Sequence, residues 1–370
     1  MRRILITAAT FFMTTAALAQ NLDNQTTAEL LPQARQEGKV TVYAFTSRIG
    51  RVEKAFEAAY PGIDMITFDM SSTEQIARIK SEAQAGLPGA DVIYISDAPV
   101  VLTELVSQNL VSPYVPPRVA NTVDDRFKSP LLAQRLSTKV LMYNEEAHPN
   151  GSPVKNLWDI TKPEWKGRVI MVDPLQRGDY LDLMTEIVLK SDEMAKTYEA
   201  AFGKPIVLAK GIRNAGQQFI ADLLANDLVL VGSTDDVNKA IGAKGQQNPP
   251  IGFTSYSDRR DNEDEGWALQ VANDVEPSNG IVFPAFLALN PKTTNPAAAR
   301  LAVDFMMGDD SDTGGEGFKP FYVAGDWPTR SDIKPHPDAI PLADFKGWQM
   351  VPAETAKIRA EVADFILALQ

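Results

Sequence analysis

Along most of the chain, short runs of β-branched and aromatic residues alternate with stretches of helical periodicity, and this order most constrains the fold. Residues 40–45 (VTVYAF), 63–68 and 91–95 (DVIYI) are strand-like. Residues 52–60 and the stretch that begins at Ser71 have apolar residues at helical spacing. Parallel neighbouring strands need a crossover connection, which is usually a helix. The alternation therefore predicts an α/β fold in which parallel strands are covered by helices.

The same alternation resumes in the second half of the chain, after a strand expected at residues 137–143. Apolar runs at residues 168–172, 228–231 and 280–289 are further expected strands, and the last of them can carry the chain back toward the first unit. Residues 156–167, which contain Trp and Pro, are expected to form a surface connection. This second group of elements predicts a second α/β unit.

The length of the chain favours two lobes, because 370 residues exceed the ~250–300 at which a single core stops growing. Chain crossings near residues 135–143 and 275–285 predict a hinge, and hinge closure is a way to enclose a small ligand. The predicted boundaries are a signal peptide at residues 1–19, lobe 1 at residues 20–136 and 281–335, and lobe 2 at residues 137–280 with the C-terminal helices at 336–370.

The N-terminus has the pattern of a signal peptide. Arg2 and Arg3 precede an apolar stretch, residues 4–18, which ends at an A-x-A cleavage site closed by Ala19. This stretch is shorter than the ~20 apolar residues of a membrane span. The chain has no cysteine, so neither a lipid-anchored cysteine nor a disulfide is available. The pattern predicts a periplasmic protein that is not lipidated; an uncleaved hydrophobic N-terminus is the alternative.

Charge and motif content argue against several classes of function. The net charge of −12 disfavours nucleic acid and anionic membranes at long range, although a cleft with local donors can still bind an anion. The chain has only two histidines, His148 and His336, and no metalloprotease, nucleophile-elbow or phosphate-loop motif. With so few His and Cys ligands, a transition-metal site is not predicted. We therefore expect a binding protein with no catalytic residues, metal or cofactor.

Polar turns follow several predicted strands at the point where a helix begins. They are Thr46-Ser47-Arg48, Ser71-Ser72-Thr73, Gln176-Arg177-Gly178-Asp179 and Ser233-Thr234-Asp235-Asp236. Ligands of open α/β sheets bind beyond the carboxyl ends of the strands, where helix N-termini favour anions. Helix capping alone explains any single turn, but two turns from each lobe together favour a ligand-binding cleft.

Two kinds of contact are expected within these turns. Arg48 and Arg177 can hold a phosphate or carboxylate through paired, charge-assisted hydrogen bonds. Carboxylates can accept hydrogen bonds from ligand hydroxyl groups. The predicted ligand-binding residues are Thr46, Ser47, Arg48, Ser72, Thr73, Arg177, Gly178, Asp179, Ser233, Asp235 and Asp258.

The chain resembles the bacterial solute-binding proteins of ABC importers, in their ferric-iron-binding branch. The resemblance is carried by VTVYAFTSRIGRVEKAFEAAYPGI, SSTEQIARIKSEAQAGLPGADVIYIS, KVLMYNEE, NLWDITKPEWKGRVIMVDP and NGIVFPAFLALNPKTTNPAAARLAVDFMM, which span most of residues 40–307. It implies a two-lobe, type II periplasmic binding protein with a hinged inter-lobe cleft. Such a protein hands its ligand to an ABC permease in the inner membrane, and one-to-one docking there favours a monomer.

Ferric-binding members of that branch use adjacent tyrosines in the turn after the late strand, and the turn at residues 232–236 has none. The segments at residues 254–262, 317–320 and 325–333, together with Trp348 and the closing helix, are more similar to a hexose-phosphate-binding subgroup. In that subgroup, hydroxyl residues and backbone N–H groups hold phosphate, whereas acids and a histidine hold sugar hydroxyls. The resemblance assigns the phosphate role to Ser47 and the sugar role to Asp235 and Asp258, with Thr234 where the histidine is expected.

The expected function is capture of a small phosphorylated organic solute, a sugar phosphate such as a hexose 6-phosphate, by hinge closure. Four alternatives stay open: binding of ferric iron or an anion-chelated metal; binding of a phosphonate or glycerol phosphate; hydrolysis of phosphate esters with a borrowed metal; and sensing together with a membrane receptor.

Overall fold

The computed structural model describes residues 22–370, so the predicted signal peptide at residues 1–19 lies outside the described residues. The strands are β1 (Lys39–Ala44), β2 (Asp64–Asp69), β3 (Val92–Ile95), β4 (Leu132–Asn144), β5 (Val169–Val172), β6 (Val229–Val231), β7 (Ile251–Thr254), β8 (Leu269–Val271), β9 (Gly280–Leu289), β10 (Trp327–Pro328) and β11 (Trp348–Gln349). The helices are α1 (Thr27–Glu37), α2 (Ile49–Ala59), α3 (Ser72–Ala85), α4 (Ala98–Val100), α5 (Gly178–Leu189), α6 (Ser191–Phe202), α7 (Ala215–Ala225), α8 (Thr234–Gly242), α9 (Asp261–Asp264), α10 (Pro296–Met306), α11 (Gly315–Phe318) and α12 (Pro352–Leu369). Within residues 22–370, no helix has the length and apolar character needed to cross a membrane.

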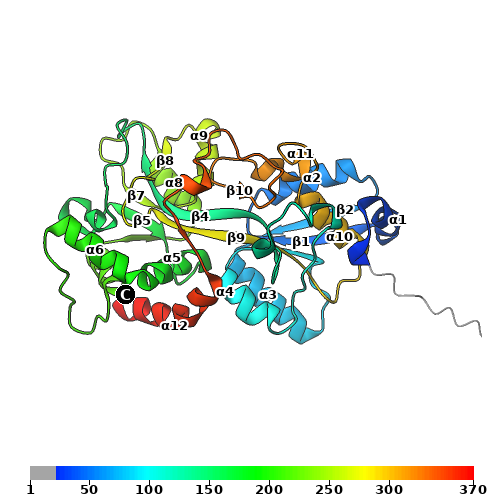
Figure 1. The fold of residues 1–370 in the computed structure, drawn as a ribbon, viewed down its shortest axis with the longest axis horizontal. Helices are drawn as coiled ribbons and strands as arrows, with labels where there is room; N and C mark the ends of the chain where they lie inside the picture. The colour runs from blue at the N-terminus through cyan, green and yellow to red at the C-terminus, as the bar shows by residue number, and fades with distance from the viewer. Residues whose placement is uncertain (1–21) are drawn as a thin grey trace, which may run out of the picture.

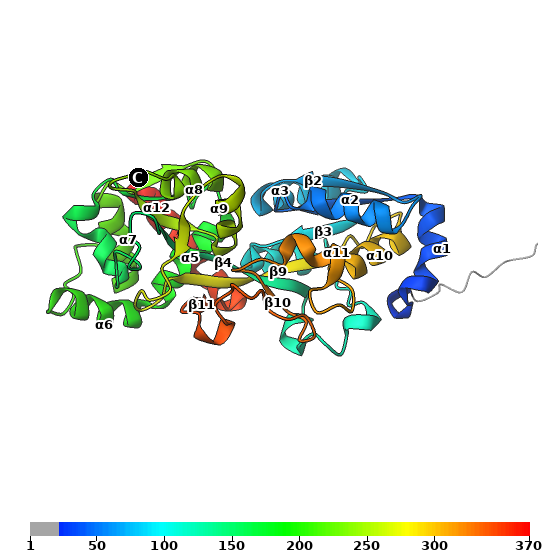
Figure 2. The ribbon, with the colours of Figure 1, turned by 90° about the horizontal axis from the view of Figure 1, so that it is seen from above.

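One sheet runs through the molecule in the order β2-β1-β3-β9-β4-β7-β5-β6. Its two ends are parallel: β1 pairs with β2 and β3, and β5 pairs with β6 and β7. The middle is antiparallel, because β4 carries the chain from one lobe to the other and β9 brings it back. Figures 1 and 2 show these two long strands passing between the lobes. The predicted parallel sheets are thus joined by an antiparallel centre.

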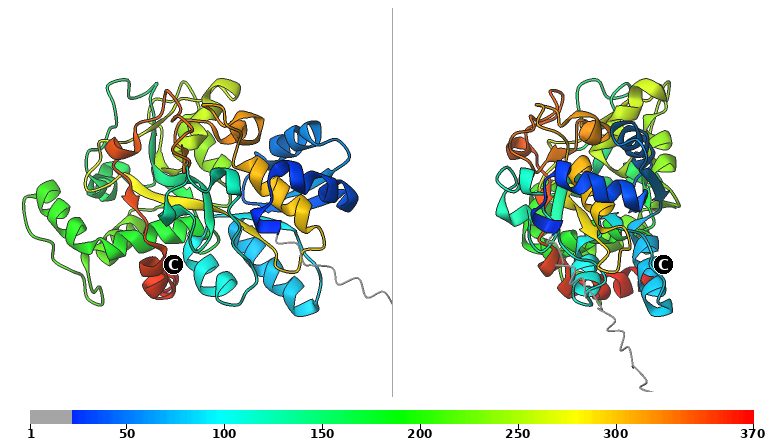
Figure 3. Two further views of the ribbon diagram at one scale, coloured as in Figure 1. Left: turned by 45° about the vertical axis from the view of Figure 1, so that its right-hand side comes forward. Right: turned by 90° about the vertical axis from the view of Figure 1, so that its right-hand side faces the viewer.

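In strands β1 and β3 of the first lobe, alternate residues face different hydrophobic cores. Val42 of β1 packs in a cluster with α1, α2 and α10, whereas its neighbour Tyr43 belongs to a second cluster that continues along β4 and β9 into the other lobe. Helices α1 and α10 lie side by side at the outer end of the first lobe (Figure 3). The core therefore continues through the crossing strands, and the exact lobe boundaries stay a prediction.

The segment expected as a surface connection, residues 156–167, lies only partly at the surface, because both of its tryptophans are buried whereas Pro163, Glu164 and Lys166 are exposed. It forms two short 3-10 turns, Leu157–Thr161 and Pro163–Trp165. Trp158 is fully buried, stacks edge-on against Phe219 and donates its Nε1–H to the carbonyl of Met194 at 2.8 Å. The prediction of a surface segment was therefore wrong for the tryptophans, which contribute large apolar area to a core even where they neighbour Pro and Lys.

Helix α12 contacts both lobes on the side opposite α8 and α9 (Figure 1). It packs on α5 and α7 and also on α4, which follows β3. Its Arg359 Nη2 lies 3.0 Å from Asp97 Oδ1, and Arg359 Nε lies 2.7 Å from Asp182 Oδ1 on α5. Both carboxylates are almost fully buried. One guanidinium is therefore shared by an acid from each lobe.

Replacing this guanidinium, as in Arg359→Met, leaves two buried carboxylates without their cation and should reduce stability by about 3 kcal/mol. Burial raises the pKa of Asp97 from 3.8 to about 6, and burial with the nearby Asp97 charge raises the pKa of Asp182 in the same direction. An acid whose pKa is raised on folding stabilises the native state at low pH and loses that contribution as the pH rises through its native pKa. The loss in the variant should therefore be larger at about pH 8 than at about pH 5.

Thermal unfolding followed by circular dichroism at both pH values measures this loss. Lys357→Met is the control, since Lys357 lies on the same helix and forms only an exposed pair with Glu354. Equal midpoints for the two variants, or a loss in Arg359→Met that does not depend on pH, would contradict the assignment.

Candidate functional site

A cleft of about 260 Å³ lies over the crossing strands, between polar turns of the two lobes. Figure 2 shows α8 and α9 of the second lobe facing β2 and α3 of the first lobe across β4 and β9. The lining residues are Phe45, Thr46, Ser47, Arg48, Asp69, Arg135, Ser137, Lys139, Arg177, Asp179, Ser233, Thr234, Asp235, Ser255, Ser257, Asp258, Arg260 and Phe283. Hydroxyl and charged side chains thus dominate the lining.

The charges of the cleft are ordered by depth. Arg135 and Lys139, on the central strand β4, are 0% and 4% exposed. Arg48 follows β1 and Arg177 follows β5, one on each side of the centre. Two exposed carboxylates, those of Asp69 and Asp235, lie at the solvent side of the cleft, which we call its mouth. Asp69 ends β2 and Asp235 follows β6, and these are the two outermost strands of the sheet. Cations therefore form the floor and walls of the cleft, and acids lie at its mouth.

On the first lobe, two arginines share one carboxylate. Arg48 Nη1 lies 2.7 Å from Asp326 Oδ2, and Arg135 Nη1 lies 3.0 Å from Asp326 Oδ1. Asp326 is brought there by β10, which pairs with β4 so that Pro328 is opposite Arg135. Burial lowers the pKa of Arg48, and Asp326 opposes that effect. Two buried guanidinium groups against one carboxylate leave one positive charge in excess.

Part of the Arg135 guanidinium has no hydrogen-bond partner within residues 22–370: Nε and Nη2 are both unpaired. Its charged centre lies 5.1 Å from the ring of Phe321 and 5.4 Å from that of Phe45, which is also a cleft residue. Buried donors are almost always paired in native proteins. Unpaired N–H groups on a buried cation that lines a cleft favour an anionic ligand there.

On the second lobe, Asp179 is the carboxylate shared by two cations. Its Oδ2 lies 3.1 Å from Lys139 Nζ and 3.4 Å from Arg177 Nη2. Burial by itself would raise the pKa of Asp179, but Lys139 and Arg177 lower it to about 2. Lys139 also donates to Ser255 Oγ at 2.7 Å. This group, like the first, carries one positive charge in excess.

The carboxylate of Asp258 is already engaged within the protein. Its Oδ1 accepts from Arg260 at 2.8 Å, and its Oδ2 accepts from Asn238 at 3.0 Å and Thr254 at 3.2 Å. Arg260 in turn also pairs with Asp261 at 3.1 Å. Little acceptor capacity is left for a ligand hydroxyl at Asp258, so its predicted sugar-binding role stays a prediction that this geometry does not favour.

Three helices begin at the cleft and direct the positive end of their dipoles toward it: α2 after Arg48, α5 after Arg177 and α8 after Ser233. The first N–H groups of a helix have no partner within the helix and can bind an anion. Ser233 caps α8 by accepting from the N–H of Asp236 at 3.1 Å, and Thr46 Oγ1 accepts from Arg48 Nε at 3.3 Å. Both hydroxyls are therefore held in a fixed position at the cleft by hydrogen bonds within the protein.

Most residues of the predicted site come together in this cleft, but three do not line it. Ser72 is buried and shares a hydrogen bond with Ser96 Oγ at 2.9 Å, and Thr73 is exposed on α3. Gly178 packs against Asp97, and a Cβ at this position would lie 2.0 Å from Asp97 Oδ2. The glycine is therefore required by a close contact behind the cleft. The residues that do line it are Thr46, Ser47, Arg48, Arg177, Asp179, Ser233, Asp235 and Asp258.

The sequence reasoning missed the floor of the cleft. Arg135, Ser137 and Lys139 occupy alternate positions of β4, so their side chains point to the same face of the sheet, and all three line the cleft. A signal was present in the sequence, because Arg135 and Lys139 are four residues apart and so lie on one face of a strand, and cations are rarely ordinary core residues.

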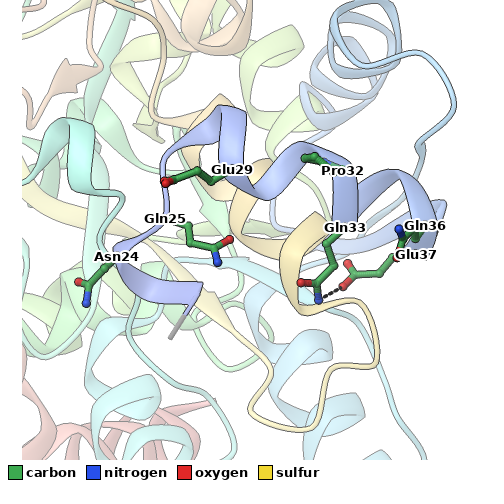
Figure 4. Close-up of a pocket in the computed structure, with 7 residues that line it drawn as sticks. All are labelled: Asn24, Gln25, Glu29, Pro32, Gln33, Gln36 and Glu37. Atoms are coloured by element: carbon green, nitrogen blue, oxygen red, sulfur yellow. Dashed lines mark hydrogen bonds between the residues drawn. The ribbon is translucent and has the colours of Figure 1, made fainter. Parts of the chain in front are cut away.

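A larger surface hollow, of about 770 Å³, lies along α1 (Figure 4). It is lined by side chains from α1 and the turn before it, including Asn24, Gln33 and Glu37. Figure 4 shows these side chains spread along one helix, with a hydrogen bond between Gln33 and Glu37. The inter-lobe cleft, in contrast, combines buried charges with residues from both lobes.

The fold and the cleft together define the class of structure: this is the two-lobe α/β fold of periplasmic binding proteins, as predicted from the sequence. No protein-family model and no curated protein matches the chain. Solved structures do. Iron-bound HitA from Pseudomonas aeruginosa is 18% identical, with a TM-score of 0.68 over 89% of this chain and 99% of that one.

Two further structures match over similar lengths. The periplasmic binding protein P5PA is 14% identical, with a TM-score of 0.68 over 90% of this chain and 99% of that one. AfuA from Actinobacillus pleuropneumoniae, with exogenous fructose-6-phosphate bound, is 17% identical, with a TM-score of 0.67 over 90% of this chain and 97% of that one. At these identities the likeness establishes the fold.

Asp326 is the carboxylate that Arg48 and Arg135 share, and its removal should make the stability of the protein depend on added anions. Asp326→Asn leaves two buried guanidinium groups without a counter-ion and should destabilise the protein by about 3 kcal/mol. Millimolar inorganic phosphate should then raise the unfolding temperature of this variant, because an anion in the cleft replaces the missing charge and binds only the folded protein.

Asp304→Asn is the matched control, since Asp304 is equally buried and pairs with Arg118 at 2.8 Å but lies outside the cleft. Phosphate should restore the unfolding temperature of Asp326→Asn by several degrees more than that of Asp304→Asn. The same recovery in both variants would mean that phosphate stabilises the fold in general and not through the cleft.

Proposed function

We propose that the protein is the periplasmic solute-binding component of an ABC importer and that it captures a small phosphorylated organic solute. A sugar phosphate such as a hexose 6-phosphate is the first candidate. The observation that carries the proposal is the pair of buried ion groups in the cleft, in which four cations share two carboxylates. The protein binds its ligand without chemistry and delivers it, as a monomer, to a permease in the inner membrane.

A phosphate dianion matches this cleft in charge and in donor chemistry. Arg48 and Arg135 have one positive charge in excess, as do Lys139 and Arg177. Burying an uncompensated cation is costly, and charge-assisted hydrogen bonds to an anion offset that cost. Helix N-termini and the hydroxyls of Thr46 and Ser47 add neutral donors of the kind that hold phosphate elsewhere. The proposed phosphate position is therefore between the two ion groups.

Iron is the main alternative within the same fold, since HitA was solved with iron bound. Ferric ion requires several anionic oxygen ligands, and five cations line this cleft: Arg48, Arg135, Lys139, Arg177 and Arg260. Their charges oppose a trivalent cation. In the part of the chain that the structure describes, no group of three or more His, Cys, Asp or Glu is placed to hold a metal ion. A phosphonate or a glycerol phosphate fits the same cations and stays a second candidate.

Thermal unfolding with a small ligand panel tests the proposal. A ligand at about 100 times its dissociation constant stabilises the native state by about 2.7 kcal/mol. Hexose 6-phosphates or glycerol phosphates should raise the unfolding temperature, whereas free hexoses and glycerol should not. A shift with ferric citrate alone would replace the proposal by iron binding, and release of inorganic phosphate from the esters would replace it by hydrolysis.

A double variant tests whether the phosphate of the ligand binds at Ser47 and Arg177. Ser47→Ala with Arg177→Met removes a hydroxyl and a charged donor, and each lost hydrogen bond to a charged group is worth about 1.5–3 kcal/mol. Affinity for the phosphate ester should fall at least about tenfold by isothermal titration calorimetry. Thr73→Ala is the control, because this predicted site residue lies outside the cleft. Unchanged affinity in the double variant would remove the phosphate from this part of the cleft.

A further inference from the structure

We propose that the ligand of this cleft carries a positively charged group in addition to its phosphate or phosphonate, so that it is a zwitterion such as an amino sugar phosphate or an aminoalkyl phosphonate. The inference rests on the proposed function, because it concerns the organic part of the same ligand. It is carried by two carboxylates at the mouth of the cleft, those of Asp69 and Asp235.

These two carboxylates belong to opposite lobes. Asp69 is the last residue of β2, and Asp235 lies in the first turn of α8, just after β6. Strands β2 and β6 are the two ends of the sheet order, so the acids reach the cleft from its two outer sides. Desolvation raises the pKa of Asp69, the charge of Arg177 opposes this, and the charges of Asp235 and Glu74 add smaller increases.

Neither carboxylate has a partner of its own. Among residues 22–370, no salt bridge or side-chain hydrogen bond involves Asp69 or Asp235. Most other acids around the cleft do have such partners: Asp179, Asp258 and Asp326 each bind two or more side chains. The acids at the mouth are therefore free to interact with a ligand.

The distribution of charge favours a cation at the mouth. The four cations of the two ion groups share only two carboxylates, so two positive charges are left in excess. A phosphate dianion neutralises both. At the mouth, Arg260 is already bound by Asp258 and Asp261, so it cannot neutralise Asp69 and Asp235 as well. Arg177 acts on Asp69 but is already paired with Asp179, so a ligand with a neutral organic part would leave the charge of the two carboxylates only partly compensated.

Closure of the lobes increases the need for a positive charge between Asp69 and Asp235. Because Asp69 and Asp235 come from opposite lobes, any approach of the lobes brings their like charges together and removes water from between them. A neutral hydroxyl can donate a hydrogen bond to a carboxylate but leaves both charges in place. An ammonium group supplies N–H donors and a positive charge at once. The acids therefore select a ligand with a charged amine over its hydroxyl analogue.

Matched pairs of ligands that differ only in amine against hydroxyl test the inference. The pairs are glucosamine 6-phosphate with glucose 6-phosphate, and ethanolamine phosphate with ethylene glycol phosphate, measured by isothermal titration calorimetry on the mature protein in the presence of a chelator. The amine member should bind at least about tenfold more tightly. This preference should fall several-fold in Asp69→Asn or Asp235→Asn and vanish in the double variant.

Asp64→Asn is the control, since Asp64 is an exposed acid on the same strand as Asp69 but outside the cleft. Inorganic phosphate is a second probe that does not depend on the organic part of the ligand. Its binding is opposed by the acids at the mouth, so Asp69→Asn with Asp235→Asn should bind it about tenfold more tightly, and Asp64→Asn should leave its affinity unchanged.

The outcomes separate the inference from the proposed function. Equal binding of both members of each pair overturns the inference and leaves the phosphate clamp in place. Binding that requires added magnesium or calcium also overturns it, because the carboxylates would then take a metal ion. If neither phosphate esters nor inorganic phosphate bind to any of these proteins, the proposed function and the inference both fail.

Discussion

The structure depends on the burial of two cations, Arg135 and Lys139, in the central strand of its sheet. Strand β4 crosses between the lobes and is buried along its whole length, so its charged residues need counter-ions from elements packed beside it. The first lobe supplies Asp326 next to β10, and the second lobe supplies Asp179 at the start of α5. The ion pairs therefore join segments far apart in the sequence to the one strand that both lobes share. They also set the chemistry of the cleft, because each carboxylate serves two cations.

Local sequence patterns predicted the elements that are stabilised locally. The helical spacing at residues 52–60 and the strand-like runs at residues 40–45 and 63–68 correspond to α2, β1 and β2, with ends that differ by a few residues. Sequence patterns gave wrong predictions where contacts with distant parts of the chain determine the structure. β4 begins at Leu132, well before the predicted strand, because its first half is needed to pair with β9 in the first lobe. The tryptophan-bearing 3-10 turns were misplaced for the same reason, since only the fold shows that they cover a core.

The candidate site also has a part that local sequence predicted and a part that it missed. Polar turns after strands predicted its walls, because the carboxyl ends of parallel strands meet at one edge of a sheet. The turn at Ser72 and Thr73 has the same sequence chemistry but does not line the cleft, since Ser72 is turned inward to Ser96. A hydroxyl at a helix start can serve the helix, a neighbouring strand or a ligand, and sequence spacing does not separate these uses. The charged floor was missed because it lies on a strand that crosses between the lobes and not in a turn.

The two charge systems of the molecule meet at the start of α5, and this links the cleft to the C-terminal helix. Asp179 of α5 faces Lys139 in the cleft, while the preceding residue, Gly178, packs against Asp97, and its carbonyl accepts from Arg359 of α12 at 3.3 Å. The N-terminus of α5 is thus held between an ion group that contacts the ligand position and another that joins the lobes. A side chain at residue 178 would push these two groups apart, so the glycine fixes their spacing. The ion group that lines the cleft and the ion group that joins the lobes are consequently positioned by the same turn of helix.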